Sequence, residues 1–408
     1  MTLLGSLFRA GPRRPRSDPT AAVTPLLYRR YMARFLHTAD WQLGMTRHFL
    51  EGEAQARFTA ARIEAIGAIG ALALEEDCSF VVVGGDVFES NQVERQVVVR
   101  ALDAMKATPD VTFYLLPGNH DPIDAASIFR SKTFLENRPP NVVTLDASVE
   151  MPVAPGVTII GAPWPNKRPL VDLVSRAIND LPADGTLRVV VGHGATDGLS
   201  PNPTDPALIV VADVEAAVSA GKIHFVALGD RHSTTSVGGT GRVWYSGAPE
   251  PTDYDETDPG NVLIVDLTAD SISVEPRRVG SWHFVRKHFD LVGAPDCERV
   301  KQFLDEIPDK QRTIVKLSLV GQLSLADMSQ LEVTLELASD LLGALERWER
   351  RSDLVVLPDG DDFEGLGLSG FAVDALQDLR ELGARAEDDA LEARDALGLL
   401  YRLAGVSS

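Results

Sequence analysis

The sequence has few cysteines, no repeats and no long apolar run, and these absences restrict the class of protein that it can encode. It contains only two cysteines, Cys78 and Cys297, in 408 residues. This excludes a disulfide framework and a thiolate metal site, and it fits a reducing cytosol. The sequence contains no internal repeat, and no apolar run reaches the roughly 18 residues that a membrane-spanning helix needs. We therefore expect a cytoplasmic globular protein of two or three domains, without contact to a membrane.

The sequence also has fewer basic than acidic residues. The chain has 39 lysines and arginines against 59 aspartates and glutamates, which gives a net charge of -20 at pH 7. A protein that binds DNA on its own usually carries a basic surface, so this balance argues against a stand-alone DNA-binding protein. It does not exclude a nuclease, because bound divalent cations invert the local field and a partner protein can supply most of the DNA affinity.

The residue composition and the pattern of apolar residues change along the chain, and these changes predict five segments. The beginning is rich in arginine and proline and lacks the order of a secretory signal, so Met32 is an alternative start to Met1. The predicted segments are a disordered extension (1–31), a catalytic domain (32–279), a small α+β domain (280–358), an acidic linker (359–370) and a helical segment (371–408).

Short apolar runs bounded by Gly, Pro and Asp predict strands, because they are too short for helices. In the catalytic domain these runs are 34–38, 80–84, 112–116, 157–161, 187–192, 223–228, 243–246 and 261–267. A helix is predicted over 58–72, where apolar residues recur at spacings of three and four. The pattern indicates an α/β fold with buried sheets flanked by helices. His37 and His224 lie inside predicted strands and are expected to be hydrogen-bonded core residues.

The rest of the chain predicts shorter elements. The small α+β domain should contain strands and helices in alternation, followed by helices in the tail. The predicted strands are 283–291, 312–320 and 353–358, and the predicted helices are 296–306, 325–350, 371–383 and 387–404.

Polar residues with metal-binding chemistry follow directly after five of the strands. These residues are Asp40 and Gln42 in HTADWQLG, Asp86 in GGDVFESN, Asn119 and His120 in LPGNHD, His193 in GHGATDG, and Asp230 and His232 in LGDRHST. A single Asp or His after a strand is more often a cap or turn residue. Five such motifs in order, on loops held by a rigid sheet, predict one shared site. Carboxylate, imidazole and carboxamide groups in this number suit two divalent cations bridged by one carboxylate, as in enzymes that hydrolyse phosphoesters.

This order of motifs resembles the calcineurin-like metallophosphoesterases. The words HTADWQLG, GGDVFESN, LPGNHDP and YSGAPEPTDYDE resemble the SbcD branch, the bacterial DNA repair nucleases, and the resemblance covers residues 34 to 358 approximately. It implies two packed β-sheets flanked by helices, an α+β cap domain and a helical C-terminal tail. It also implies metal-dependent hydrolysis of DNA by 3′→5′ exonuclease and single-strand endonuclease activity. Its expected partners are DNA, a second copy of the chain, and an SbcC-type coiled-coil ATPase bound by the C-terminal helices.

The resemblance also implies a role for each site residue. The first cation would be held by Asp40, Gln42 and His232, the second by Asn119, His193 and Asp230, and Asp86 would bridge them. His120 would be the catalytic residue that acts on the leaving 3′ oxygen without binding a cation. Arg231 is a candidate phosphate contact, with an ordinary exposed loop arginine as the equal alternative. Trp41 is expected to pack beneath the site.

Two positions depart from the family pattern. Gln42 and Asp230 stand where the pattern has histidines. Oxygen donors thus replace imidazoles, which favours Mn²⁺, with Mg²⁺ as the second choice, over Zn²⁺. Because a glutamine is a neutral and weaker ligand, the first cation site should be the weaker of the two.

Two other functions remain open. One is a phosphodiesterase of the same fold that acts on small molecules or nucleotides, although such an enzyme needs neither a cap domain nor a docking tail. The other is a non-catalytic scaffold with a decayed metal site, which only Gln42 and Asp230 support. The sequence does not decide the cation, the exonuclease polarity, the preferred DNA structure or the dependence on ATP.

Overall fold

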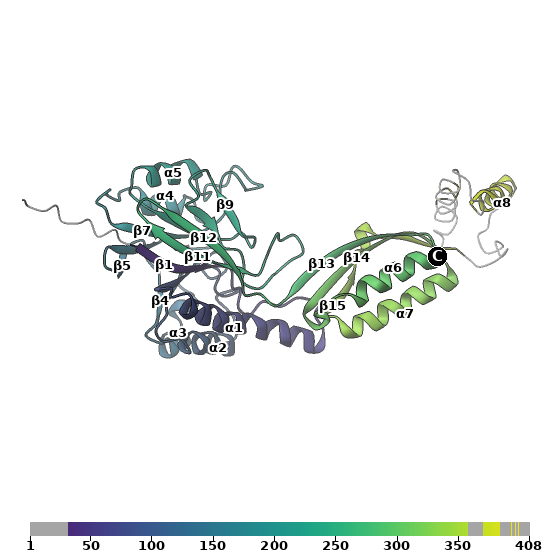
Figure 1. The fold of residues 1–408 in the computed structure, drawn as a ribbon, viewed down its shortest axis with the longest axis horizontal. Helices are drawn as coiled ribbons and strands as arrows, with labels where there is room; N and C mark the ends of the chain where they lie inside the picture. Colours follow the sequence, from purple (N-terminus) through teal and green to yellow (C-terminus); the bar gives the residue numbers. More distant parts are fainter. Residues whose placement is uncertain (1–31, 358–369, 384–392, 394–395, 397–398, 400–408) are drawn as a thin grey trace, which may run out of the picture. The chain divides into compact units, whose positions relative to one another are not determined.

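The computed structural model describes residues 32–357 and 370–383, together with Ala393, Ala396 and Leu399 (Figure 1). The predicted N-terminal extension, nearly all of the acidic linker and most of the helix predicted at 387–404 lie outside the described residues. Among the helices that the structure describes, none is long and apolar enough to cross a membrane.

Two six-stranded sheets form the first and larger part of the fold. In spatial order, the first sheet contains β12 (Ile272–Arg278), β11 (Asn261–Thr268), β1 (Met32–Thr38), β2 (Phe80–Val83), β3 (Thr112–Leu115) and β4 (Val142–Thr144). The second sheet contains β5 (Glu150–Ala154), β6 (Val157–Gly161), β7 (Leu187–His193), β8 (Phe225–Gly229), β10 (Val243–Tyr245) and β9 (Thr235–Val237). Strands β1 to β4 are parallel, as are β6, β7, β8 and β10. All carboxyl ends within each parallel set therefore lie at the same edge.

The two sheets pack face to face through a buried apolar layer. Phe35 of β1 stacks on Phe80 of β2 with ring centroids 5.0 Å apart, and it meets Phe225 of the second sheet edge-on at 5.5 Å. The neighbouring Leu36 faces the other way, into the helices that cover the first sheet. Because such strands are buried on both faces, their sequences are continuous apolar runs rather than alternating ones. The predicted fold of two packed sheets is confirmed.

Helices cover the outer face of each sheet (Figure 1). The first sheet is covered by α1 (Gly52–Glu75), α2 (Arg95–Lys106) and α3 (Lys132–Asn137). The second is covered by α4 (Leu173–Ile178) and α5 (Val211–Ser219). The helix predicted at 58–72 lies within α1, whose buried side chains include Phe58, Ala61, Ala65 and Ile69.

His37 and His224 are core residues, as predicted. His37 is fully buried, and its Nε2 lies 3.1 Å from the carbonyl oxygen of Leu228 in the second sheet. Burial lowers the pKa of His37 to about 3. The Nδ1 atom of His224 accepts a hydrogen bond from the backbone N–H of Arg188 at 3.2 Å. His37 thus links the two sheets, and His224 links the neighbouring strands β7 and β8.

Acid should destabilise the protein through His37. The unfolded chain binds a proton at this ring near pH 6.5, whereas the folded protein does so only near pH 3. Stability should therefore fall as the pH drops below 6.5, by about 1.4 kcal/mol per pH unit. His37→Gln should flatten this slope in urea unfolding between roughly pH 7 and pH 5, and the exposed control His48→Gln should not. A His37→Gln protein with the wild-type slope would contradict the assignment.

A third sheet and two helices follow the double-sheet part. Strand β14 (Thr313–Ser324) is central and pairs in parallel with β13 (His283–Leu291), β15 (Ala344–Arg347) and β16 (Asp353–Leu357). Helices α6 (Ala294–Asp305) and α7 (Leu325–Leu341) pack on it through an apolar core of their own. A smaller apolar cluster joins this part to α1, where the ring of Trp282 meets Phe58 edge-on at 5.1 Å.

The helix predicted over 325–350 is wrong in its second half. The helix α7 ends at Leu341, and Ala344–Arg347 is a strand paired with β14. Gly343 makes the turn, and its N–H donates to the carbonyl oxygen of Thr313 at 2.9 Å. A Cβ at this position would lie 2.7 Å from the ring of Trp282. Sheet pairing here overrides the helix propensity of the local sequence. The helix predicted at 371–383 is present as α8 (Phe371–Gly383).

Candidate metal centre

The predicted ligands all leave the sheets at the carboxyl ends of parallel strands. They follow β1 (Asp40, Gln42), β2 (Asp86), β3 (Asn119) and β8 (Asp230, His232), or end β7 (His193). Backbone hydrogen bonds join the loops at this edge, as between the N–H of Gly194 and the carbonyl oxygen of Gly229 at 3.1 Å. The fold thus brings together residues that are almost 200 positions apart in the sequence.

Four of these residues have a left-handed backbone. Their φ angles are 55° for Asp40, 45° for Gln42, 51° for Asp86 and 97° for Asp230. Positive φ is uncommon outside glycine, and it persists where the surrounding structure over-determines it. Hydrogen bonds between the loops do so here. The N–H of Asp40 donates to the carbonyl oxygen of Gly85 at 3.0 Å, and that of Gln42 donates to the carbonyl oxygen of Asp86 at 2.9 Å.

Two glycines allow the loops to approach one another. A Cβ on Gly85 would lie 2.2 Å from Nδ1 of His193, and one on Gly118 would lie 2.3 Å from Oδ1 of Asp86. Neither side-chain atom could stay in place if these glycines were replaced. The close packing of the cluster therefore depends on the GGD and GNHD words of the sequence.

His193 lies at the centre of the cluster. Its Nδ1–H donates to the carbonyl oxygen of Gly84 at 2.8 Å, which fixes the ring. Its Nε2 lies 2.6 Å from Oδ1 of Asn119, 3.4 Å from Oδ1 of Asp86 and 3.8 Å from Oδ1 of Asp230. These four side chains are the ones expected around the second cation.

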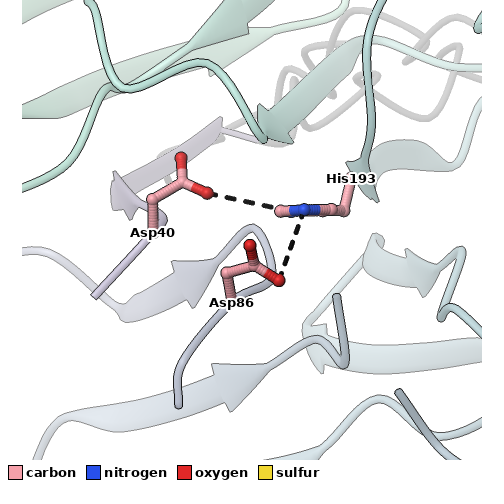
Figure 2. A group of neighbouring side chains, drawn as sticks. All are labelled: Asp40, Asp86 and His193. Atoms are coloured by element: carbon pink, nitrogen blue, oxygen red, sulfur yellow. Dashed lines mark ion pairs between the residues drawn. The ribbon is translucent and has the colours of Figure 1, made fainter. Parts of the chain in front are cut away.

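Three of the side chains form a compact group that could hold a metal ion (Figure 2). One ligand atom from each of Asp40, Asp86 and His193 lies within 4.8 Å of the other two, and all three residues are buried. The imidazole ring lies between the two carboxylates, with an ion pair to each (Figure 2).

The buried carboxylates of this group favour a positive charge beside them. Burial raises the pKa of Asp40 to about 6. Burial opposes the charged form of His193, but the carboxylates of Asp86, Asp40 and Asp230 raise its pKa to about 10. Burial also works against the charge of Asp86, yet His193 and His120 lower its pKa. A protonated imidazole thus compensates the carboxylates here, and divalent cations would do so more fully by displacing its Nε2 proton.

Neighbouring side chains orient His232, which is one of the ligands expected for the first cation. The Nδ1 atom of His232 lies 2.7 Å from Oγ1 of Thr252 and 3.0 Å from Oε1 of Glu256. A carboxylate behind an imidazole fixes its tautomer and leaves Nε2 free for a cation. That Nε2 lies 3.2 Å from the side-chain nitrogen of Gln42. Within the described part of the chain, the buried Oε1 of Gln42 has no hydrogen-bond partner, which suits an oxygen that binds a cation.

The donor set as a whole fits two divalent cations. It offers carboxylates from Asp40, Asp86 and Asp230, amide oxygens from Gln42 and Asn119, and imidazoles from His193 and His232. The N–H of Asp230 donates to both carboxylate oxygens of Asp40, at 2.9 and 3.1 Å, so one candidate ligand orients another. Oxygen donors outnumber nitrogen donors, which is the balance that Mn²⁺ and Mg²⁺ prefer to Zn²⁺.

His120 lies beside the cluster. Its backbone N–H donates to Oδ1 of Asp86 at 2.9 Å, and its Nδ1–H donates to the carbonyl oxygen of Glu89 at 2.9 Å. Its Nε2 is 3.9 Å from Oδ2 of Asp86, and the side chain is 37% exposed, against 0% for His193. An oriented ring in reach of solvent suits proton transfer better than metal binding.

Arg231 and Trp41 complete the set of residues that the sequence singled out. Arg231 is exposed, and its Nε donates to Oγ1 of Thr235 at 2.9 Å. Trp41 is 1% exposed, and its indole N–H donates to Oγ1 of Thr38 at 3.0 Å. The tryptophan is therefore packed in the core between two predicted ligands. Among the described residues, Arg231 has the contact of an ordinary loop arginine.

Sequence reasoning assigned no role to Thr252 and Glu256, although they hold His232. Both residues lie in the word YSGAPEPTDYDE, which carried part of the resemblance to the SbcD branch. That word was the available signal. It was insufficient because neither residue directly follows a strand, so only the folded loop shows their contact with His232.

Residues 33–233 match the family model for calcineurin-like phosphoesterases. These residues form a calcineurin-like phosphoesterase domain. Members of the family use divalent metals, and the candidate metal group of Asp40, Asp86 and His193 lies within the matched residues. The predicted family is confirmed, and so is the metallophosphoesterase fold.

Two curated relatives of this phosphoesterase are named a DNA repair protein and a component of a nuclease. The chain is 26% identical over 309 residues to the DNA double-strand break repair protein Mre11 of Haloferax volcanii, covering 71% of this chain and 62% of the relative. It is 33% identical over 93 residues to the SbcD component of the nuclease SbcCD of Rhodobacter capsulatus, covering 22% of each. The structure is similar to that of TT1561 of Thermus thermophilus, with 11% identity and a TM-score of 0.39 over 61% of this chain and 100% of that chain. The match spans less than two thirds of each curated relative.

Proposed function

We propose that this phosphoesterase is an SbcD-like nuclease that hydrolyses DNA phosphodiesters with two divalent cations. The observation that carries the proposal is the convergence of the strand-end residues around His193 and His232. The first cation would be held by Asp40, Gln42, Asp86 and His232, and the second by Asp86, Asn119, His193 and Asp230. Bound there, the cations would supply Lewis acidity toward water and a phosphate oxygen.

The chain's own residues have distinct tasks in this proposal. Glu256 and Thr252 hold the ring of His232, and the carbonyl oxygen of Gly84 holds that of His193. The carbonyl oxygen of Glu89 orients His120 through Nδ1. His120 then presents Nε2 as the atom that passes a proton to the leaving 3′ oxygen, in 3′→5′ exonuclease and single-strand endonuclease reactions.

DNA as substrate is supported by the relatives, both of which are named for DNA repair or nuclease activity. The net charge of -20 makes tight DNA binding by this chain alone unfavourable. We therefore propose that the protein acts as a homodimer with an SbcC-type coiled-coil ATPase, which supplies most of the DNA affinity. The C-terminal helices, of which α8 (Phe371–Gly383) is described, would bind that ATPase.

Gln42→His should make the nuclease less demanding of Mn²⁺. An imidazole binds Mn²⁺ more strongly than a neutral amide, and position 42 belongs to the weaker first site. DNA hydrolysis by the wild type should rise with Mn²⁺ to high concentrations, be lower with Mg²⁺ and be slight with Zn²⁺. The variant should reach half its maximal rate at roughly tenfold lower Mn²⁺, and the exposed Gln92→His should match the wild type. Absence of hydrolysis at every Mn²⁺ concentration, with the ATPase and DNA present, would instead support the scaffold function.

Removing the residues after Pro358 should abolish binding of the ATPase partner and leave phosphodiester hydrolysis intact. The third sheet and its helices end before this point, so the truncated chain should still hydrolyse a small model phosphodiester. It should no longer co-purify with the SbcC-type ATPase, because the proposed docking helices are missing. The full chain is the control in both assays. Retained binding of the ATPase would place the docking surface elsewhere.

A further inference from the structure

Arg62 of α1 is a buried cation that the proposed chemistry does not use. Its residue is 3% exposed, and the guanidinium lies 4.5 Å from the centre of the Phe58 ring. Within the described residues it forms no ion pair with a carboxylate. Its pKa is lowered by burial to about 10, so it stays charged at neutral pH. Burying a charge without a partner carboxylate is unfavourable, and an apolar side chain would serve packing better.

The guanidinium instead donates to backbone carbonyl groups of two separate loops. One nitrogen, Nη1, donates to the carbonyl oxygens of Trp41 at 3.4 Å and Glu250 at 3.3 Å. The other, Nη2, donates to the carbonyl oxygen of Pro251 at 3.0 Å and to the sulfur of Met45 at 3.4 Å. A single rigid fork thus joins residues that are about 210 positions apart.

One of these loops carries two of the ligands expected for the first cation, Asp40 and Gln42, and the other carries the residues that hold a third, His232. Trp41 stands between Asp40 and Gln42, whose left-handed backbones need support from their surroundings. Pro251 directly precedes Thr252, which together with Glu256 fixes the ring of His232. The two halves of the first site therefore meet at the same guanidinium, behind the ligands rather than among them.

We propose that Arg62 is a positioning residue for the first cation, which sets the spacing between the Asp40–Gln42 loop and His232. This inference rests on the proposed two-cation function. Groups that orient metal ligands from behind usually change metal affinity by about 10- to 100-fold when they are removed. Loss of the fork should thus weaken the first site and leave the second, which Asn119 and His193 define, unchanged.

Arg188 provides a control for a purely structural role, although it differs from Arg62 in forming ion pairs with Glu150 and Asp184. It is also buried, at 1% exposure, and it also donates to backbone carbonyl groups, those of Pro182 and Lys222. It lies near the start of β7, whereas His193 lies at the end of that strand. Replacing Arg188 should lower stability without moving any proposed metal ligand.

The test measures Mn²⁺ binding to the full-length chain by electron paramagnetic resonance. Thermal unfolding of the same proteins is measured in parallel. Arg62→Met should lower the affinity of the weaker site by about 10- to 100-fold and leave the tighter site as in the wild type. Arg62→Lys keeps the charge but loses the fork, and should weaken the same site by a smaller factor. Arg188→Met should lower the melting temperature and leave both affinities unchanged.

Several outcomes would overturn the proposal. One is an Arg62→Met protein that binds two Mn²⁺ ions with wild-type affinities. If Arg62→Met does not fold, Arg62→Lys decides, and wild-type affinity at both sites would refute the proposal. Equal weakening of both sites would show a general structural role. A wild-type chain that binds fewer than two Mn²⁺ ions would refute the two-cation function itself, so the two failures are distinguishable.

Discussion

Asp86→Asn should remove bound Mn²⁺ from both positions and reduce DNA hydrolysis to background. Asp86 is the one carboxylate proposed to bind both cations, and its Oδ1 lies 3.4 Å from Nε2 of His193. An asparagine keeps the shape of the side chain but loses the negative charge that attracts two divalent cations into a buried site. The variant therefore tests the effect of the lost charge without changing the size of the side chain.

Mn²⁺ titration and a nuclease assay on the same preparation check this result. Asp266→Asn is a suitable control, because Asp266 forms an ion pair with Arg34 on the first sheet and is not a proposed ligand. That control should bind two Mn²⁺ ions and remain active. An Asp86→Asn protein that still binds two ions would show that another group bridges them.

His120→Ala should keep both cations and lose most of the rate. The structure places the ring outside the ligand cluster, held through Nδ1 by the carbonyl oxygen of Glu89. Removing a positioned proton donor lowers a rate by roughly 10²- to 10⁴-fold. The loss should appear in kcat at saturating Mn²⁺, while the Mn²⁺ concentration for half-maximal rate stays as in the wild type.

A substrate with a better leaving group provides the discriminating measurement for His120. A p-nitrophenyl phosphodiester needs little protonation of the leaving oxygen, so His120→Ala should lose much less activity on it than on DNA. The exposed His48→Ala is the control and should affect neither substrate. If His120→Ala loses a Mn²⁺ ion, the residue belongs to the ligand set and its catalytic assignment is wrong.

The sequence predicts the buried strands well because burial on both faces leaves a continuous apolar run. Strands β2 and β7 illustrate this, since every residue in them is buried. The strands of the two six-stranded sheets that were not predicted, β4, β5, β9 and β12, all lie at sheet edges. Strand β5 contains Pro152 and strand β12 contains Pro276, and proline normally demotes a run to a loop. Their pairing with one neighbour only is a property of the folded sheet.

The candidate ligands were predictable because each one follows or ends a strand within a short motif. Their supporting residues were not, because support depends on contacts between distant segments. Arg62 looks like an ordinary polar residue of a helix, and Glu256 like part of an acidic loop. The left-handed backbone of Asp40 and Gln42 is equally hidden in the sequence, since it arises from hydrogen bonds to the loop after β2.

The most direct test of the two-cation centre is anomalous X-ray scattering from crystals of the wild-type protein grown with Mn²⁺. We predict two manganese peaks that share Asp86 as a ligand, one beside Gln42 and His232 and the other beside Asn119 and His193. The peak beside Gln42 should be the weaker at limiting Mn²⁺. A single peak at saturating Mn²⁺, or two peaks without a common contact to Asp86, would contradict the two-cation centre.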